Sequence, residues 1–186
     1  MKDYFLIKNE DDYITIVNRK NKLRNNYVPK DLVRLDNTYS SKEIYLRKKA
    51  KDSFDKMVKD AKDKNLTLIA VSGYRSYNYQ KTLFNNYVKE KGYEYANMCC
   101  AKAGHSEHQT GLAVDIADSS LDYDNFNLTK EFNWVKNNAY KYGFILRYPK
   151  DKIAITGYKY EPWHYRYVGI DLAKHLYENN LVLEEK

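Results

Sequence analysis

Apolar positions recur along the chain at two spacings, which predicts a mixture of helices and strands. Between residues 40 and 64 they follow the helical period, and Ser40 stands three residues before Glu43, the spacing of a capping box. The side chains on that apolar face are Leu46, Ala50, Phe54, Met57, Val58 and Ala61. We therefore expect a helix from Ser40 to about Lys64 whose apolar face packs against a core.

Three further segments show helical spacing. One follows the break at residues 72–76 and ends before Gly92, a second runs from about Thr129 to Gly143, and a short one covers residues 172–177. Their apolar positions include Leu83, Phe84, Tyr87, Val88, Phe132, Val135 and Ala139. The chain thus has enough helices to cover a sheet.

Five short runs have the composition or the alternation of strands: residues 13–17, 66–71, 111–116, 144–147 and 163–168. In the third run, alternation gives one face to apolar side chains and the other to Asp115 and two small neighbours. In the last run, His164 and Arg166 share a face opposite three aromatic residues. Two polar strand faces can therefore meet at one site.

Strands and helices alternate without a regular βαβ rhythm, so the expected fold class is α+β, with a central and mainly antiparallel sheet flanked by helices. The 186 residues suit one domain spanning positions 1–186. Within it, the basic and irregular residues 1–40 are expected to form a peripheral N-terminal segment packed on the rest.

The net charge indicates what kind of surroundings the protein favours, but it does not identify a partner. The 32 Lys and Arg residues exceed the 25 Asp and Glu residues by seven, which favours polyanionic surroundings. No nucleic-acid motif accompanies this charge, so we expect no nucleic-acid partner. The composition, with 43% hydrophobic residues and three prolines, excludes a disordered or low-complexity chain.

The cysteines and the apolar runs say little about location. Cys99 and Cys100 are adjacent, a placement that rarely reaches disulfide geometry, and no apolar run approaches the length of a membrane span. Residues 1–8 lack the features of a secretory signal. We expect the cell envelope of a Gram-positive bacterium if a signal or anchor has been removed, and the cytoplasm is the alternative.

Three side chains form a candidate metal site. A catalytic Zn²⁺ takes three protein ligands from His, Asp, Glu or Cys and keeps one position open. His108, Asp115 and His164 supply such a set from two separate polar segments. Each of these three residues alone could have a purely structural role. The occurrence of all three together is less often accidental. His105 is a competing ligand that we expect to lie behind the site or face solvent, and we expect no site role for His175.

Two charged residues near these ligands suit hydrolytic chemistry. Glu161 precedes Pro162, which disfavours a helix at this point, so its carboxylate can lean from a turn over the metal and exchange a proton with water. Arg75 lies in a tight break after a strand, where its planar guanidinium can bind a carboxylate or stabilise an oxyanion. The alternative is that Arg75 serves only as a partner for a surface carboxylate.

Four segments in order resemble the VanY/LdcB-type zinc carboxypeptidases of the M15 peptidase family (M15B), and the resemblance covers roughly Tyr13 to the C-terminus. The matching segments are residues 72–76 with Gln80, residues 106–116, residues 143–149 and residues 161–169. The resemblance implies the hedgehog/DD-peptidase fold and a peptidoglycan stem peptide or precursor as substrate. One departure is Ala103 before Gly104, where many relatives have proline.

Matched by position, the resemblance assigns one Zn²⁺ per chain to the same three ligands and the catalytic base to Glu161. It further implies that Arg75, Gln80 and Ser106 hold the terminal residue of the substrate or polarise the scissile carbonyl. Tyr148 is implied at the pocket wall.

The expected function is a D,D-carboxypeptidase that removes the terminal D-alanine from peptides ending in D-Ala-D-Ala, either in glycopeptide resistance or in ordinary wall trimming. The alternatives are an L,D-carboxypeptidase acting on the tetrapeptide stem and a non-catalytic cell-wall-binding module. The presence of Glu161 argues against the module, because a structural zinc needs no base. We expect a monomer.

Overall fold

A four-stranded antiparallel sheet forms the centre of the protein in the computed structural model, which describes residues 4–186. Its strands run in the order β5 (Ile69–Ser72), β6 (Ala113–Ala117), β8 (His164–Tyr167) and β7 (Phe144–Leu146). Each neighbouring pair is antiparallel. The α+β class with a central antiparallel sheet is therefore confirmed.

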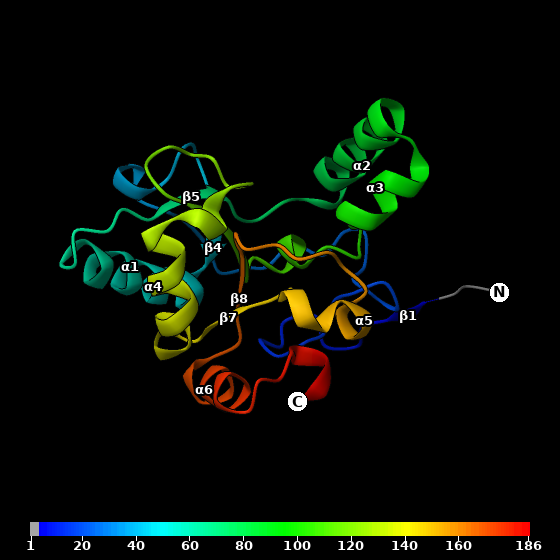
Figure 1. Cartoon of the computed structure of the whole chain (residues 1–186). Coiled ribbons are helices and arrows are strands. Elements are labelled where there is room, and N and C mark those ends of the chain that lie inside the picture. The colour runs from blue at the N-terminus through cyan, green and yellow to red at the C-terminus, as the bar shows by residue number, and fades with distance from the viewer. Residues whose placement is uncertain (1–3) are drawn as a thin grey trace.

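Two helices cover one face of this sheet (Figure 1): α1 (Lys48–Lys62) and α4 (Lys130–Asn138). On α1 the predicted apolar positions Ala50, Phe54, Met57 and Ala61 are fully buried. The side chain of Thr129 accepts a hydrogen bond from the Phe132 amide, which begins α4 where the sequence predicts. The apolar face of β6 packs into the same core cluster as α1.

The remaining helices surround the sheet. A hairpin of α2 (Tyr77–Lys91) and α3 (Tyr93–Cys99) projects away from α1 and α4, while α6 (Ile170–Glu178) lies near the C-terminus (Figure 1). The other helical turns are η1 (Asn37–Tyr39), η2 (Glu107–Thr110), η3 (Phe126–Leu128), η4 (Ala139–Tyr142), η5 (Lys150–Lys152), α5 (Ile153–Thr156) and η6 (Leu183–Glu185). The hairpin matters for function because it forms one wall of a pocket described below.

The first predicted helix begins later than the sequence pattern indicates. Residues Tyr45–Arg47 form β4, which pairs with β3 (Leu32–Arg34), and α1 starts only at Lys48. Ser40 forms a bridge with Ala70 instead of capping a helix. Leu46 is buried as predicted, but it lies in a strand and not in a helix. Pairing with β3 therefore outweighs the local helical spacing.

The predicted strand at residues 13–17 is wrong. In the described part of the N-terminal segment, strands occur instead at β1 (Phe5–Leu6), β2 (Asn21–Lys22) and β3. The carbonyl groups of Tyr13 and Thr15 accept hydrogen bonds from the Arg166 guanidinium, which replaces the pairing a strand would need.

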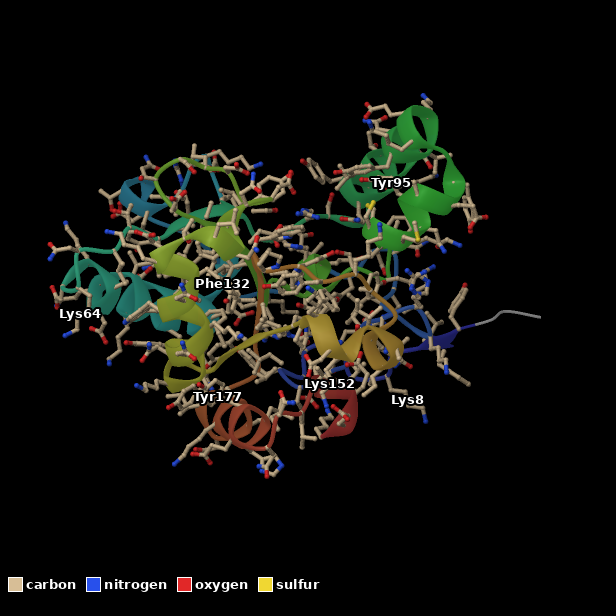
Figure 2. The ribbon with its side chains drawn as sticks, in the orientation of Figure 1. Lys8, Lys64, Tyr95, Phe132, Lys152 and Tyr177 are labelled. Atoms are coloured by element: carbon tan, nitrogen blue, oxygen red, sulfur yellow. The ribbon has the colours of Figure 1, made fainter. Side chains whose placement is uncertain are left out.

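Side chains sort by polarity around this framework (Figure 2). Phe132 is buried between α4 and the core, whereas Lys8 and Lys64 are exposed at the periphery. Among residues 4–186, none of the helices combines the length and the apolar character needed to cross a membrane. The N-terminal segment also contributes apolar packing, because Val17 and Leu23 are fully buried.

Candidate active site

Strand register brings two of the predicted metal ligands face to face. Asp115 on β6 pairs directly with His164 at the start of β8, and Ser72 at the end of β5 lies on the other side of Asp115. The apolar residues on either side of Asp115 belong to the core. Alternation along β6 therefore leaves its carboxylate on the face away from the core, as predicted.

The third ligand, His108, comes from the short turn η2 that precedes β6. The side chain of Ser106 accepts a hydrogen bond from the His108 amide and caps the turn. Gly111 ends the turn at φ 66°, in the left-handed region that favours glycine. This capped turn holds His108 beside Asp115.

The hydrogen bonds of His108 define which ring nitrogen is available. Its Nδ1 lies 2.6 Å from the carbonyl oxygen of Gly73, which can only accept, so Nδ1 carries the proton. The other nitrogen, Nε2, lies 3.3 Å from Asp115 Oδ2. Burial and the neighbouring Arg75 lower the pKa of His108, so its neutral form is favoured.

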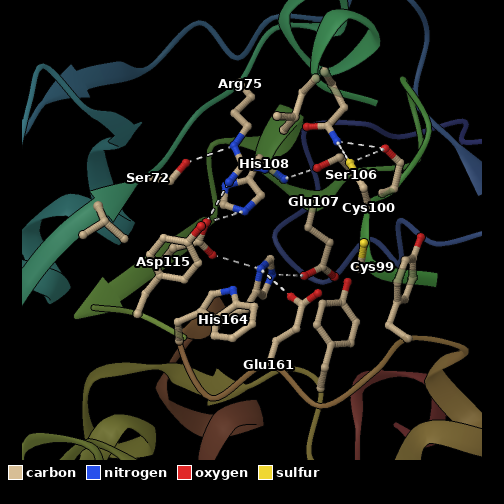
Figure 3. Close-up of a pocket in the computed structure, with 18 of the residues that line it drawn as sticks. Ser72, Arg75, Cys99, Cys100, Ser106, Glu107, His108, Asp115, Glu161 and His164 are labelled. Carbon is tan, nitrogen blue, oxygen red and sulfur yellow. Dashed lines mark hydrogen bonds and ion pairs between the residues drawn. The ribbon is translucent and has the colours of Figure 1, made fainter. Parts of the chain in front are cut away.

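His164 lies between two carboxylates (Figure 3). Its Nδ1 is 3.2 Å from Asp115 Oδ1, and its Nε2 is 3.4 Å from Glu107 Oε2. Burial opposes the charged ring, but the nearby carboxylates of Asp115 and Glu107 outweigh it and raise the pKa of His164 to about 9. Burial also opposes ionisation of Asp115, yet His108, His164 and Arg75 hold its pKa well below the usual range.

These three residues fit a divalent cation. Donor atoms of His108, Asp115 and His164 all lie within 4.8 Å of one another, and each residue is buried. The buried Asp115 Oδ1 makes no hydrogen bond and lies beside His164 Nδ1, so this carboxylate oxygen is available to a cation shared by the two side chains. Two imidazoles and one carboxylate are the ligand types of a catalytic Zn²⁺ site.

Glu161 lies beside this group. Its Oε2 is 3.6 Å from His164 Nδ1, and its backbone amide donates to the Tyr148 carbonyl. Burial raises the pKa of Glu161 to about 7, and His164 and Arg75 oppose the rise. A carboxylate with that pKa can both accept and return a proton near neutral pH.

Arg75 pairs with a predicted ligand instead of a surface carboxylate. Its Nη2 donates to Asp115 Oδ2 at 2.7 Å, and its Nε donates to Ser72 Oγ at 2.9 Å. The side chain is 20% exposed and lines the pocket. The guanidinium therefore orients the aspartate and also presents positive charge to a bound molecule.

A pocket of about 220 Å³ opens beside these groups, between the sheet and the α2–α3 hairpin. Gln80, Ser106 and Tyr148, the residues assigned to substrate by resemblance, all line it. Gln80 is 2% exposed, and its Oε1 has no hydrogen-bond partner. The Tyr148 ring lies 4.9 Å from the His164 ring, between centroids. All eight residues predicted for the site thus come together.

Sequence reasoning missed several residues that surround the site. Tyr123, Tyr158 and Trp163 line the pocket, and the buried Glu107 contacts His164. Two features of the sequence pointed toward Glu107 as a neighbour of the site. Glu107 stands next to His108, and Arg166, which contacts Glu107, shares a strand face with His164. Neither feature reveals where the Glu107 side chain points, because η2 is neither a strand nor a regular helix.

The remaining histidines and the cysteines differ in position. His105 hydrogen-bonds the Asn18 carbonyl through Nδ1, and His175 is exposed on α6, so neither belongs to the ligand group among the described residues. Cys99 and Cys100 are free thiols that line the pocket wall near Gln80. Burial raises the pKa of Cys100 to about 11, so its thiol is protonated near neutral pH.

Comparison with known proteins gives a family match over most of the chain. The family VanY, described as D-alanyl-D-alanine carboxypeptidase, matches residues 43–170. The carboxypeptidase-named protein YodJ of Bacillus subtilis (strain 168) is 47% identical over 96% of this chain and 68% of its own length. The matched range contains all eight residues of the site.

Two solved structures are similar in both sequence and fold. The LdcB LD-carboxypeptidase, described with the basis of its peptidoglycan recognition, has a TM-score of 0.91 and 46% identity, over 98% of this chain and 88% of that one. A mutant of the vancomycin resistance D,D-pentapeptidase VanY, in complex with Zn(II), has a TM-score of 0.80 and 34% identity, over 93% of this chain and 97% of that one.

Proposed function

The chain belongs to the VanY family of D-alanyl-D-alanine carboxypeptidases, and from that membership we propose that it removes the terminal D-alanine of peptidoglycan stem peptides ending in D-Ala-D-Ala. It is a zinc metallopeptidase. The observation that carries the proposal is the ligand group of His108, Asp115 and His164 with the buried carboxyl group of Glu161 beside it.

The metal ligands and Glu161 have different roles in the proposed hydrolysis. When bound by the three ligands, Zn²⁺ supplies Lewis acidity, which polarises a carbonyl group and lowers the pKa of water. Glu161 accepts a proton as the oxygen of water bonds to the scissile carbonyl carbon. It then returns that proton to the amine nitrogen as the carbon–nitrogen bond breaks. The pKa of about 7 suits both transfers.

Arg75 is proposed to stabilise negative charge on the substrate. Its guanidinium reaches the pocket while one nitrogen remains bonded to Asp115. A fixed cation of this kind can stabilise an oxyanion or bind a terminal carboxylate. Gln80 and Ser106 supply further polar groups at the pocket wall, and Tyr148 bounds the pocket beside His164.

The L,D-carboxypeptidase reaction on the tetrapeptide stem is the second candidate. It is favoured by the similarity to LdcB, which exceeds the similarity to the VanY structure in both identity and TM-score. Both reactions would use the same metal ligands and base. Pocket shape around the penultimate residue would distinguish them, because an L and a D residue direct their side chains differently.

We also propose a monomer that acts in the cell envelope of a Gram-positive bacterium. The net charge of +7 supports this location, because anionic wall polymers attract a basic surface. Size-exclusion chromatography with light scattering tests the monomer, and fractionation of cells that carry the native gene tests the location. A cytoplasmic fraction would contradict the second proposal.

A peptide assay tests the main proposal. Zinc-loaded protein is incubated separately with pentapeptide and tetrapeptide stems, and mass spectrometry identifies the released amino acid and the remaining peptide. Release of D-alanine from the pentapeptide alone supports D,D-activity, whereas release from the tetrapeptide alone supports L,D-activity. If zinc is bound stoichiometrically and neither peptide is cut, both candidates fail and a binding module is the better explanation.

A further inference from the structure

A carboxylate that is fully buried lies on the far side of His164 from the ligand group. The Glu107 side chain is 0% exposed. Its Oε2 lies 3.4 Å from His164 Nε2, the ring nitrogen that does not face Asp115. A carboxylate oxygen at that position can accept a hydrogen bond from Nε2–H, which keeps the ring proton on Nε2 and leaves Nδ1 free toward Asp115.

Two buried arginines hold the other oxygen of Glu107. Arg147 Nε donates to Glu107 Oε1 at 2.8 Å, and Arg166 Nη1 donates to the same oxygen at 2.7 Å. Both arginine side chains are 0% exposed. The carboxylate is therefore held at one oxygen by two donors while the second oxygen faces the histidine.

The arginines are themselves fixed by segments far away in the chain. Arg147 forms a two-pronged pair with Glu184 of η6, with nitrogen–oxygen distances of 2.8 and 2.6 Å. Arg166 Nη2 donates to the carbonyl groups of Tyr13 and Thr15 at 3.0 and 2.9 Å. Glu107 and Glu184 thus balance the two arginine charges, so the cluster is neutral as a unit.

Stability alone is a weak reason for such a cluster. Burying four charged groups carries a large desolvation cost, and apolar residues of similar volume often stabilise a fold at least as well. Apolar residues, however, cannot accept a hydrogen bond from a histidine ring. The one polar atom of the cluster that lies beside the ligand group is Glu107 Oε2, which is directed at His164.

We propose that Glu107 is a positioning residue of the zinc site, which Arg147 and Arg166 hold in place so that its Oε2 fixes the orientation of the His164 ring. The proposal concerns zinc binding and does not depend on which peptide is cut. It connects the N-terminal segment and η6 to a metal ligand through the two arginines.

The test replaces Glu107 by glutamine and measures zinc affinity by competition with a chelator. Glutamine has a single acceptor oxygen, so it cannot serve both arginines and His164 at once. We expect zinc affinity to fall about 10- to 100-fold, the usual effect of losing a partner of a metal-bound histidine. Zinc affinity of the folded Glu107→Gln protein that stays within about twofold of the unchanged protein would overturn the proposal.

Glu131→Gln is the matched control. Glu131 is also buried, at 6% exposure, accepts a hydrogen bond from the Thr67 amide, and is not among the residues that line the pocket. The Glu131→Gln variant therefore measures the general effect of replacing a buried glutamate by glutamine. We expect its zinc affinity to match that of the unchanged protein. An equal fall in both variants would also overturn the proposal, because the effect would then be one of stability.

A second measurement covers the case in which Glu107→Gln does not fold. Nitrogen NMR of the unchanged, zinc-loaded protein labelled at histidine reports which ring nitrogen of His164 carries a proton. We expect a proton on Nε2 that exchanges slowly with water, because it forms a buried hydrogen bond to Glu107. A proton that exchanges rapidly from Nε2, or its absence there, would overturn the proposal.

Discussion

The two ring nitrogens of His164 have different surroundings, and this difference organises the site. Nδ1 lies toward Asp115 and Glu161, whereas Nε2 lies toward Glu107. The sequence identifies His164 as a ligand candidate from its residue type and its strand face. It contains no information on which nitrogen faces the metal, since that depends on the side-chain torsions and on a glutamate 57 positions earlier.

Replacement of Glu161 by glutamine is the sharpest test at this scale. Glutamine keeps the size of the side chain but cannot accept a proton from water at neutral pH, so kcat is expected to fall about 10²- to 10⁴-fold. Steady-state kinetics on the preferred stem peptide measures the loss, and metal analysis measures bound zinc. We expect the zinc content to remain close to one per chain.

The zinc content gives that experiment its control. Glu161 lies near the ligand group but outside the three residues whose donor atoms converge. If Glu161→Gln lost its zinc together with its activity, the residue would be a ligand instead of a base. Full activity with full zinc would instead exclude Glu161 from proton transfer.

Elements set the position of each ligand through register and turns. The β6–β8 ladder aligns Asp115 with His164, and a shift of either strand by one residue would turn the ligand on that strand to the core face. The turn η2 adds His108, and it depends on Gly111, where the chain reverses into β6. The sequence predicts both strands, but their partners come only from the folded sheet.

We expect Gly111→Ala to destabilise the protein more than Gly157→Ala. Both glycines have positive φ, 66° and 74°, which costs about 1–2 kcal/mol for alanine. A Cβ at Gly111 would also lie 2.7 Å from Leu32 Cδ2 and 3.0 Å from Arg47 Cγ, which adds about 1–3 kcal/mol for overpacking. Urea unfolding of both variants measures the free energy of unfolding.

Gly157 is the matched control because it has the same backbone conformation without the crowding. A Cβ there would meet only the Arg19 side chain, at 3.4 Å, which is ordinary contact. Equal losses of stability in the two variants would show that glycine is needed at position 111 only for its positive φ and not for lack of space. The additional loss at Gly111 would show that β3 and β4 pack directly against the turn that carries His108.

At the scale of the whole molecule, both ends of the described chain reach toward the site. The carbonyl groups of Tyr13 and Thr15 hold Arg166, and Glu184 holds Arg147. The N-terminal segment, expected from the sequence to be peripheral, therefore takes part in the buried charge cluster behind His164. Residues 13–17, which the sequence predicts as a strand, instead supply two of the carbonyl acceptors of this cluster.

Zinc binding is expected to release protons and to stabilise the fold. Without the cation the pKa of His164 is raised to about 9, so its ring is protonated at about pH 8 and must lose that proton to bind zinc. Calorimetric titration in buffers of different ionisation enthalpy should show about one proton released per zinc at pH 8. The number should fall toward zero above pH 9, where the ring is already neutral.

Thermal unfolding gives the second readout of the same experiment. Zinc binds the assembled ligands and not the unfolded chain, so adding a chelator should lower Tm, and excess zinc should restore it. Proton release near zero at about pH 8 would mean that His164 is already neutral without zinc. An unchanged Tm would mean that the three residues hold no zinc.

The sequence predicts some elements of the fold and some residues of the site, but not others. The apolar periods of residues 130–138 and 113–117 agree with α4 and β6, because local pattern and tertiary packing agree there. The start of α1 at Lys48 was not predictable, because the preceding residues have helical spacing but pair as β4 with β3. The roles of Arg147 and Glu107 were likewise hidden, because their partners lie 37 to 59 residues away.

By itself the amino-acid order determined which side chains carry the chemistry, because imidazole, carboxylate and guanidinium groups have fixed donor and acceptor properties wherever they stand. It also determined the alternation that puts Asp115 on the face away from the core. Tertiary structure alone decided that two distant segments bring three ligands within reach of one cation and that a buried glutamate lies behind one of them. The reason is physical: a distance between side chains depends on strand register and packing, which no local pattern encodes.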